Sequence, residues 1–373
     1  MKIPKIAHNT LVILGSLRKQ PRKRPRKQQS PNYLLQLPVE LILCIADFLN
    51  PPDLILFSQT CYSLRAILQK HTITTKLSRA EYLLYLTACA REQPNKWVCK
   101  KCATLHPIRK LDTPAVGFLR SSCPRRSYEG FRLGTPLWYG QMRVQLEHRH
   151  IQLAFKYTRL QQDKYKSYLK ALLAPHHDMG FSPTDHQLKI YYSTYPKIAT
   201  AHNGNLTFLL LSSWRYYKDK LCGKILFDKI GYLPISPHVI IAPFWTWRPQ
   251  DSSYRLQEAI KSALEAEGDS QEHKGACPRC ATDFSVQSDS QFLDLHVWQD
   301  FGPEGSPGDL AWEIHHTGTT IDGVPNGWGR GRGPTLYHEP GTIRKLYGKC
   351  ENVKIRATRA SLANKAVGIF HRI

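Results

Sequence analysis

Residues 37–68 read LPVELILCIADFLNPPDLILFSQTCYSLRAIL, and this stretch decides the fold of the N-terminal part of the chain. Its first half carries an apolar residue every four positions, which is the spacing of a single helical face: Leu37, Leu41, Ile45 and Leu49. Asn50-Pro51-Pro52 ends that helix and allows a second one to begin. Apolar residues three and four positions apart then continue to Leu68. The stretch therefore predicts three short helices packed as one module.

The module is small for a self-sufficient hydrophobic core, because chains below about 40 residues usually need outside help to fold stably. We therefore expect it to be stabilised by contacts with the rest of the chain, with a partner, or with both. On periodicity alone, an ordinary helical subdomain is the simpler interpretation.

The residue identities, however, resemble those of the F-box. That family pattern is matched here by Leu37-Pro38, Glu40-Leu41, Ile45, Leu49, Asp53-Leu54, Cys61 and Leu64-Arg65. The resemblance implies a helical dock for the Skp-type adaptor of a cullin-RING ubiquitin ligase (an SCF complex), and hence a role in ubiquitin conjugation. It also implies which residues would make the apolar contact with that adaptor: Leu37, Pro38, Leu41, Ile45, Leu49 and Leu54.

The composition is that of a folded globular protein with sizeable cores. The chain has 373 residues, of which 42% are hydrophobic and 10% aromatic, so we expect two or three domains. The sequence contains no run of 18 apolar residues, and we expect neither a membrane span nor a membrane partner.

The chain is strongly basic, with a formal net charge of +23, which favours acidic partners such as nucleic acid. Part of the excess lies in the run 18–27, and we expect residues 1–32 to form a disordered basic tail. A solvated tail, a nuclear-localisation signal and an arm that contacts nucleic acid remain alternatives. The run favours a nuclear over a cytoplasmic location.

Two Cys-x-x-Cys pairs lie far apart, Cys99 with Cys102 and Cys277 with Cys280, within the motifs at 97–107 and 276–284. Each pair can supply two of the four ligands that zinc prefers. The first interpretation is one structural zinc held by all four cysteines, about one ion per chain, which would pin the two segments together. A local site of Cys99, Cys102, His106 and Cys123 is a second possibility. Buried thiols or a redox pair without metal are the third.

The expected fold class is α+β, with the three-helix F-box at 33–72 and a mixed region at 73–373 pinned by the zinc site. Within the mixed region we expect three helices, a strand followed by a helix, and three β-rich segments: helices over 79–92, 161–174 and 257–267, the pair within 137–161, and β-rich segments at 188–195, at 206–211 followed by 214–217, and at 292–298. The order of the F-box and the two cysteine motifs is similar to that of a group of F-box proteins from filamentous fungi.

These features predict a non-catalytic adaptor whose residues 73–373 present a protein substrate to the ligase. The alternative is a nuclear, zinc-containing protein that binds nucleic acid. An enzyme is not expected, because the sequence shows no G-x-S-x-G elbow and no coherent set of serine, histidine and aspartate residues.

Overall fold

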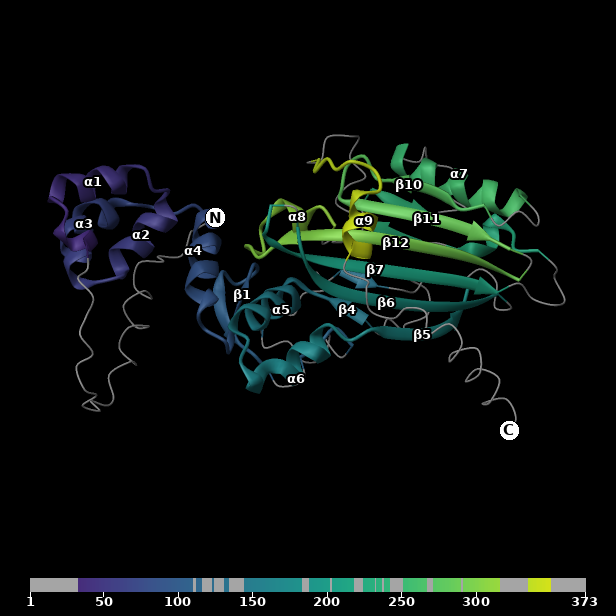
Figure 1. Ribbon diagram of the computed structural model, residues 1–373, viewed down its shortest axis with the longest axis horizontal. Coiled ribbons are helices and arrows are strands. Elements are labelled where there is room, and N and C mark those ends of the chain that lie inside the picture. The colour runs from purple at the N-terminus through teal and green to yellow at the C-terminus, as the bar shows by residue number, and fades with distance from the viewer. Residues whose placement is uncertain are drawn as a thin grey trace, which may run out of the picture. The chain divides into compact units, whose positions relative to one another are not determined.

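The computed structural model describes two compact units, residues 1–75 and 76–373, each of which is considered by itself (Figure 1). The described residues are 33–109, 112–115, 123, 131–133, 144–182, 188–201, 203–217, 224–231, 233–236, 238–241, 251–266, 271–289, 291–315 and 335–349. The predicted basic tail, residues 1–32, lies outside them.

The first unit consists of short helices: the 3-10 helix η3 (Tyr33–Gln36), α1 (Val39–Asp47), α2 (Pro51–Gln59) and α3 (Tyr62–Thr74). Pro38 is the N-cap of α1. The side chain of Asn50 accepts the backbone N–H of Asp53 at 3.0 Å and so caps α2, as asparagine does well at this position. The apolar residues that these helices turn inward form a small core: Ile42, Ala46, Leu64 and Leu68.

The second unit begins with α4 (Arg79–Arg91), which packs on the hairpin of β1 (Lys96–Cys99) and β2 (Thr104–Pro107). A capping box between Ser78 and Glu81 starts α4, because each side chain satisfies a backbone N–H that the first helical turn leaves free. Leu83 and Leu86 of α4 are buried in a cluster with Val98 of β1.

The centre of the second unit is a six-stranded antiparallel sheet with the strand order β10-β11-β12-β7-β6-β5. Its strands are β5 (His176–Phe181), β6 (Lys189–Thr200), β7 (Leu206–Tyr217), β10 (His273–Ala276), β11 (Thr282–Ser288) and β12 (Phe292–Pro303). β6, β7 and β12 are the long strands, and the register of the last two places Trp298 opposite Leu211.

The two faces of this sheet carry separate cores. The larger core joins one face to α5 (His148–Leu160), to α7 (Asp251–Glu265) and to the hairpin of β8 (Leu233–Ser236) and β9 (Val239–Ile241). On the opposite face, α9 (Thr342–Lys349) packs its Leu346 against Leu211 and Trp298 (Figure 1). The remaining elements are β3 (Phe131–Leu133), β4 (Val144–Leu146), α6 (Asp163–Leu172), the 3-10 helix η5 (Phe227–Ile230) and α8 (Leu310–Glu313).

The structure confirms the α+β class and the expected elements of the second unit, although the long strands run further than predicted. β6 extends to Thr200, five residues beyond the predicted segment, and β7 continues through Ser212 and Ser213, which separate its two predicted β-rich stretches. The two strands pair along their whole length, so polar residues that the hydrophobic pattern does not include also belong to the strands. None of the described helices is long and apolar enough to cross a membrane.

Candidate functional site

The first unit exposes an apolar surface on α1. Leu41 and Ile45 are 49% and 38% exposed, and Phe48 just beyond the helix is 91% exposed, whereas Ile42 on the inner face of α1 is 1% exposed. A unit this small does not expose several large apolar side chains without cost, and clustered exposure of this kind marks interaction sites. We call Leu41, Ile45 and Phe48, which are four and three positions apart and so share one side of the helix, the α1 face.

The residues predicted to contact an adaptor fall into two groups. Pro38, Leu41 and Ile45 are exposed, as a contact role requires. Leu37, Leu49 and Leu54 are half-buried, so each side chain has only part of its surface left for contact with a partner. Phe48 was not among the predicted contacts, because it lies outside the F-box pattern that implied them.

The first cysteine pair lies in the β1–β2 hairpin and forms a compact cluster with two further residues. One ligand atom from each of Cys99, Cys102, His106 and Cys123 lies within 4.8 Å of the other three. The Sγ atom of Cys123 is 3.6 Å from that of Cys99 and 3.4 Å from that of Cys102. Ala103 takes a left-handed backbone conformation, with φ of 48°, which turns the chain directly after the pair.

This cluster fits a tetrahedral zinc ion. With Zn–S distances of about 2.3 Å, tetrahedral geometry places sulfur atoms roughly 3.8 Å apart, close to the observed separations. Nε2 of His106 is buried and has no hydrogen-bond partner among the described residues, so it is available as the fourth ligand. Burial lowers the pKa of His106, which favours the neutral, ligating form of the ring.

Helix α5 holds the hairpin in place through buried polar side chains. The amide of Gln152 accepts the N–H of Val98 at 2.9 Å and donates to the carbonyl of Val98 at 3.0 Å. It therefore satisfies both backbone groups of Val98, as a neighbouring strand would. One turn further along, Lys156 donates to the carbonyl of Lys96 at 2.6 Å.

A buried ion pair lies beside the same hairpin. Asp112 accepts two hydrogen bonds from Arg149, at 2.7 Å from Nε and 2.9 Å from Nη2, and Arg149 also lies over the ring of Trp97 at 5.7 Å. Burial raises the pKa of Asp112, but the hydrogen bonds from His150 and Arg149 outweigh it and hold that pKa below its usual range. The pair fixes α5 against the base of the hairpin.

The second cysteine pair does not join the first, which corrects the predicted single site of Cys99, Cys102, Cys277 and Cys280. Cys277 and Cys280 lie in the turn between β10 and β11 and group with His238 instead. The pairs belong to different cores, because Cys277 and Cys280 are buried in the large core of the sheet while Cys99 packs with Trp97 and Cys123. The two motifs have matching sequences, but the fold places them too far apart to share one set of ligands.

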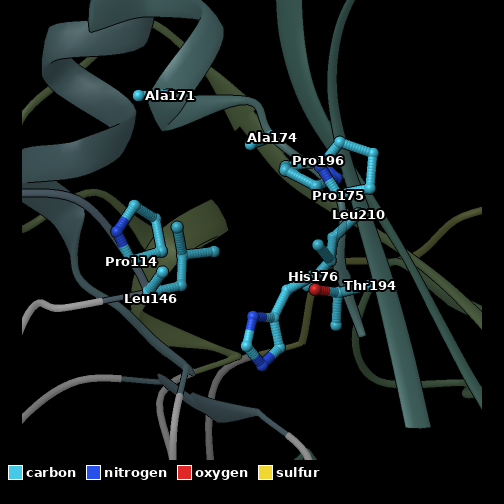
Figure 2. Close-up of a pocket in the computed structure, with 10 residues that line it drawn as sticks. Pro114, Leu146, Ala171, Ala174, Pro175, His176, Thr194, Pro196 and Leu210 are labelled. Atoms are coloured by element: carbon cyan, nitrogen blue, oxygen red, sulfur yellow. The ribbon is translucent and has the colours of Figure 1, made fainter. Parts of the chain in front are cut away.

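A small cavity separates α6 from the sheet (Figure 2). It measures about 40 Å³ and is lined largely by apolar groups such as Leu146 and Leu210, with His176 and Thr194 at one side. Ligand sites for small molecules are usually about 300–1,000 Å³, so this cavity admits only a few water molecules.

Comparison with known proteins identifies one domain. The family model of the F-box domain matches residues 34–76, the segment that carries the α1 face. No curated protein and no solved structure matches the chain, so the wider likeness to fungal F-box proteins stays a prediction. The chain contains an F-box domain at its N-terminal end.

Proposed function

We propose that this protein is a substrate adaptor of a Skp/cullin-RING ubiquitin ligase. F-box domains generally bind the Skp-type adaptor within such ligases, and the match at residues 34–76 is the observation that carries the proposal. The exposure of the α1 face supports it, because this apolar surface stays exposed in the fold and lies within the matched segment.

The second unit is proposed to hold the protein substrate. An adaptor of this kind needs no catalytic group, since it acts by bringing the substrate close to the subunits that carry out the chemistry. A sheet with apolar cores packed on both faces would supply a stable scaffold for that placement.

We also propose that Cys99, Cys102, His106 and Cys123 hold a structural zinc ion. Four protein ligands leave no open coordination position, so the ion would stabilise the fold without taking part in a reaction. Its support is the geometry of the four ligand atoms. The ion would fix the β1–β2 hairpin, on which α4 and α5 both pack.

The adaptor role is tested by truncating the α1 face. Burying an aliphatic side chain is worth about 1.5–3 kcal/mol relative to full exposure, and Leu41 and Ile45 are 49% and 38% exposed. Each therefore has about half of that value to gain in an interface. The variant Leu41→Ala/Ile45→Ala should lose about 1.5–3 kcal/mol of binding, which is a roughly 10- to 100-fold rise in Kd for the Skp-type adaptor.

The matched control is Leu84→Ala, because Leu84 is 46% exposed and lies on α4, outside the matched segment. It should bind the adaptor as the wild type does. Binding to purified adaptor is measured by calorimetry for all three proteins, with helical content compared by circular dichroism. Equal affinity of the double variant and the wild type would refute a contact role for the α1 face.

A further inference from the structure

His238, Cys277 and Cys280 form a second buried cluster of metal-ligating side chains. One ligand atom from each lies within 4.8 Å of the other two. The residues are 8%, 1% and 0% exposed. They come from two separate places in the fold, since His238 directly precedes β9 and the cysteines lie in the β10–β11 turn. No further histidine, cysteine or carboxylate joins this cluster within the described part of the chain.

The β10–β11 turn is arranged to present both sulfur atoms to one point. Its base is closed by hydrogen bonds from the N–H of Cys277 to the carbonyl of Thr282 at 2.8 Å, and from the N–H of Thr282 to the carbonyl of Cys280 at 2.7 Å. The backbone N–H of Arg279 points at Sγ of Cys277, at 3.4 Å. A backbone donor aimed at sulfur stabilises a thiolate more than a thiol, and the thiolate is the form that binds metal.

Ser236 links the two halves of the cluster. Its hydroxyl accepts the backbone N–H groups of His238 at 3.2 Å and Val239 at 3.1 Å, which orders the turn that carries the histidine. The same hydroxyl lies 3.6 Å from Sγ of Cys280. The hydroxyl of Thr282, the first residue of β11, lies 3.3 Å from the same sulfur atom. Ligands of a metal site are commonly oriented by such outer hydrogen bonds.

We propose that His238, Cys277 and Cys280 bind a second zinc ion, separate from the one at the β1–β2 hairpin. Two thiolates and one imidazole are a donor set that favours zinc over magnesium or calcium. Three protein ligands leave the fourth tetrahedral position to a water molecule. Binding converts both thiols to thiolates and releases their protons to solvent.

The second zinc would fasten one hairpin to the sheet. β8 and β9 form a two-stranded sheet of their own, and their apolar residues Leu233, Ile235 and Ile241 pack into the large core. An ion shared by His238 and the β10–β11 turn adds a fixed connection between this hairpin and the edge of the main sheet. The ion would stabilise the fold, since its ligands are buried and it closes a chain segment of about 40 residues between His238 and the β10–β11 turn.

The test is the metal content of the full-length protein, purified without chelator and measured by native mass spectrometry with elemental analysis. The wild type should carry two zinc ions. Cys277→Ser/Cys280→Ser should carry one, and Cys99→Ser/Cys102→Ser should carry one. Cys44→Ser, which changes an exposed cysteine outside both clusters, should keep both ions.

X-ray absorption on the wild-type protein keeps the proposal testable if a variant fails to fold. Two separate sites with three and two cysteines predict an average of between two and three sulfur ligands per zinc. A single site of four cysteines predicts four. Hydrogen exchange adds a local readout, because removal of the second ion should reduce amide protection in residues 233–241 and 273–286.

Two outcomes would overturn the second site. A wild type that carries a single zinc ion, which Cys277→Ser/Cys280→Ser retains and Cys99→Ser/Cys102→Ser loses, would leave only the hairpin site, and the adaptor proposal would be unaffected. One zinc that disappears in both double variants, with four sulfur ligands in the wild type, would restore the single four-cysteine site and refute both assignments made here.

Discussion

Replacement of Asp112 by asparagine tests whether the buried ion pair beside the β1–β2 hairpin stabilises the second unit. Both side chains of the pair are inaccessible to solvent, Arg149 at 0% and Asp112 at 1%. Oδ2 of Asp112 faces Nε of Arg149, and Oδ1 faces Nη2 of Arg149 together with Nε2 of His150. Nδ1 of His150 accepts the backbone N–H of Glu147, so the proton of the neutral ring is on Nε2 and is donated to Asp112.

Every side-chain oxygen of Asp112 therefore faces a donor. Whichever way an asparagine amide is turned, its NH2 group meets an N–H of Arg149, and one hydrogen bond becomes a repulsive contact between two donors. The guanidinium also loses one of its two carboxylate partners, while Glu147 stays paired with Nη1 of Arg149. Breaking a buried ion pair by removing one partner typically costs about 3–5 kcal/mol, and because Glu147 still offsets the charge of Arg149, we expect Asp112→Asn to lower the free energy of unfolding by about 3 kcal/mol, the lower end of that range.

Asp294→Asn is the matched control, because Arg215 and Asp294 form a pair with the same two-bond geometry, at 2.6 Å for both bonds. The Arg215 side chain is 33% exposed, so water can hydrate the group that the substitution leaves unpaired. We expect a cost of about 1–2 kcal/mol there. Urea unfolding at pH 7, in the presence of zinc and followed by tryptophan fluorescence, measures both variants. A cost for Asp112→Asn no greater than that for Asp294→Asn would refute the argument from burial.

Two further predictions concern the same unit. Burial lowers the pKa of His150 to about 4 and that of His315 to about 3, so both rings are neutral when folded, while the unfolded chain binds protons below its ordinary pKa of about 6.5. The free energy of unfolding should therefore be independent of these two rings above pH 6.5 and should fall from there toward pH 4, by up to about 1.4 kcal/mol per pH unit for each ring. Urea unfolding measured across this range should show a shallower dependence of that free energy on pH for His315→Gln than for the wild type. An unchanged dependence on pH would contradict the assignment. Gly302→Ala should destabilise the unit, because Gly302 has φ of +84° and a Cβ there would lie 2.5 Å from Cβ of Ala311; a melting temperature equal to that of the wild type would show that this close approach is unimportant.

The F-box could be predicted from sequence because its signals are local. Helix spacing, the proline at the start of α1 and the Asn50 cap all lie within a few residues of the structure that they determine. Exposure within the module was harder to predict, since the pattern places Leu41 and Ile42 next to each other but does not say which one faces the core. The structure separates them at 49% and 1% exposure.

The candidate metal ligands were only partly predictable from the sequence. Cys-x-x-Cys spacing identifies two turns that can each present two sulfur atoms, and the local alternative of Cys99, Cys102, His106 and Cys123 is a set that the structure brings together. The sequence does not show which residue joins Cys277 and Cys280, because that residue lies far away along the chain. Cys123 reaches Cys99 from 24 residues away and His238 reaches Cys280 from 42 residues away. Gln152 is a similar case, because a buried polar residue on an amphipathic helix gives no sequence signal of the backbone edge that it satisfies.

The central claim is that the F-box domain of this protein docks a Skp-type adaptor, and direct binding between the purified full-length chain and that adaptor tests it most simply. Size-exclusion chromatography with light scattering should show a stable complex of one copy of each protein, and calorimetry should show saturable binding with a negative heat-capacity change, as burial of an apolar surface requires. Absence of a complex, with a full-length protein whose circular dichroism shows folded helices, would contradict the adaptor role and leave the F-box as a structural module.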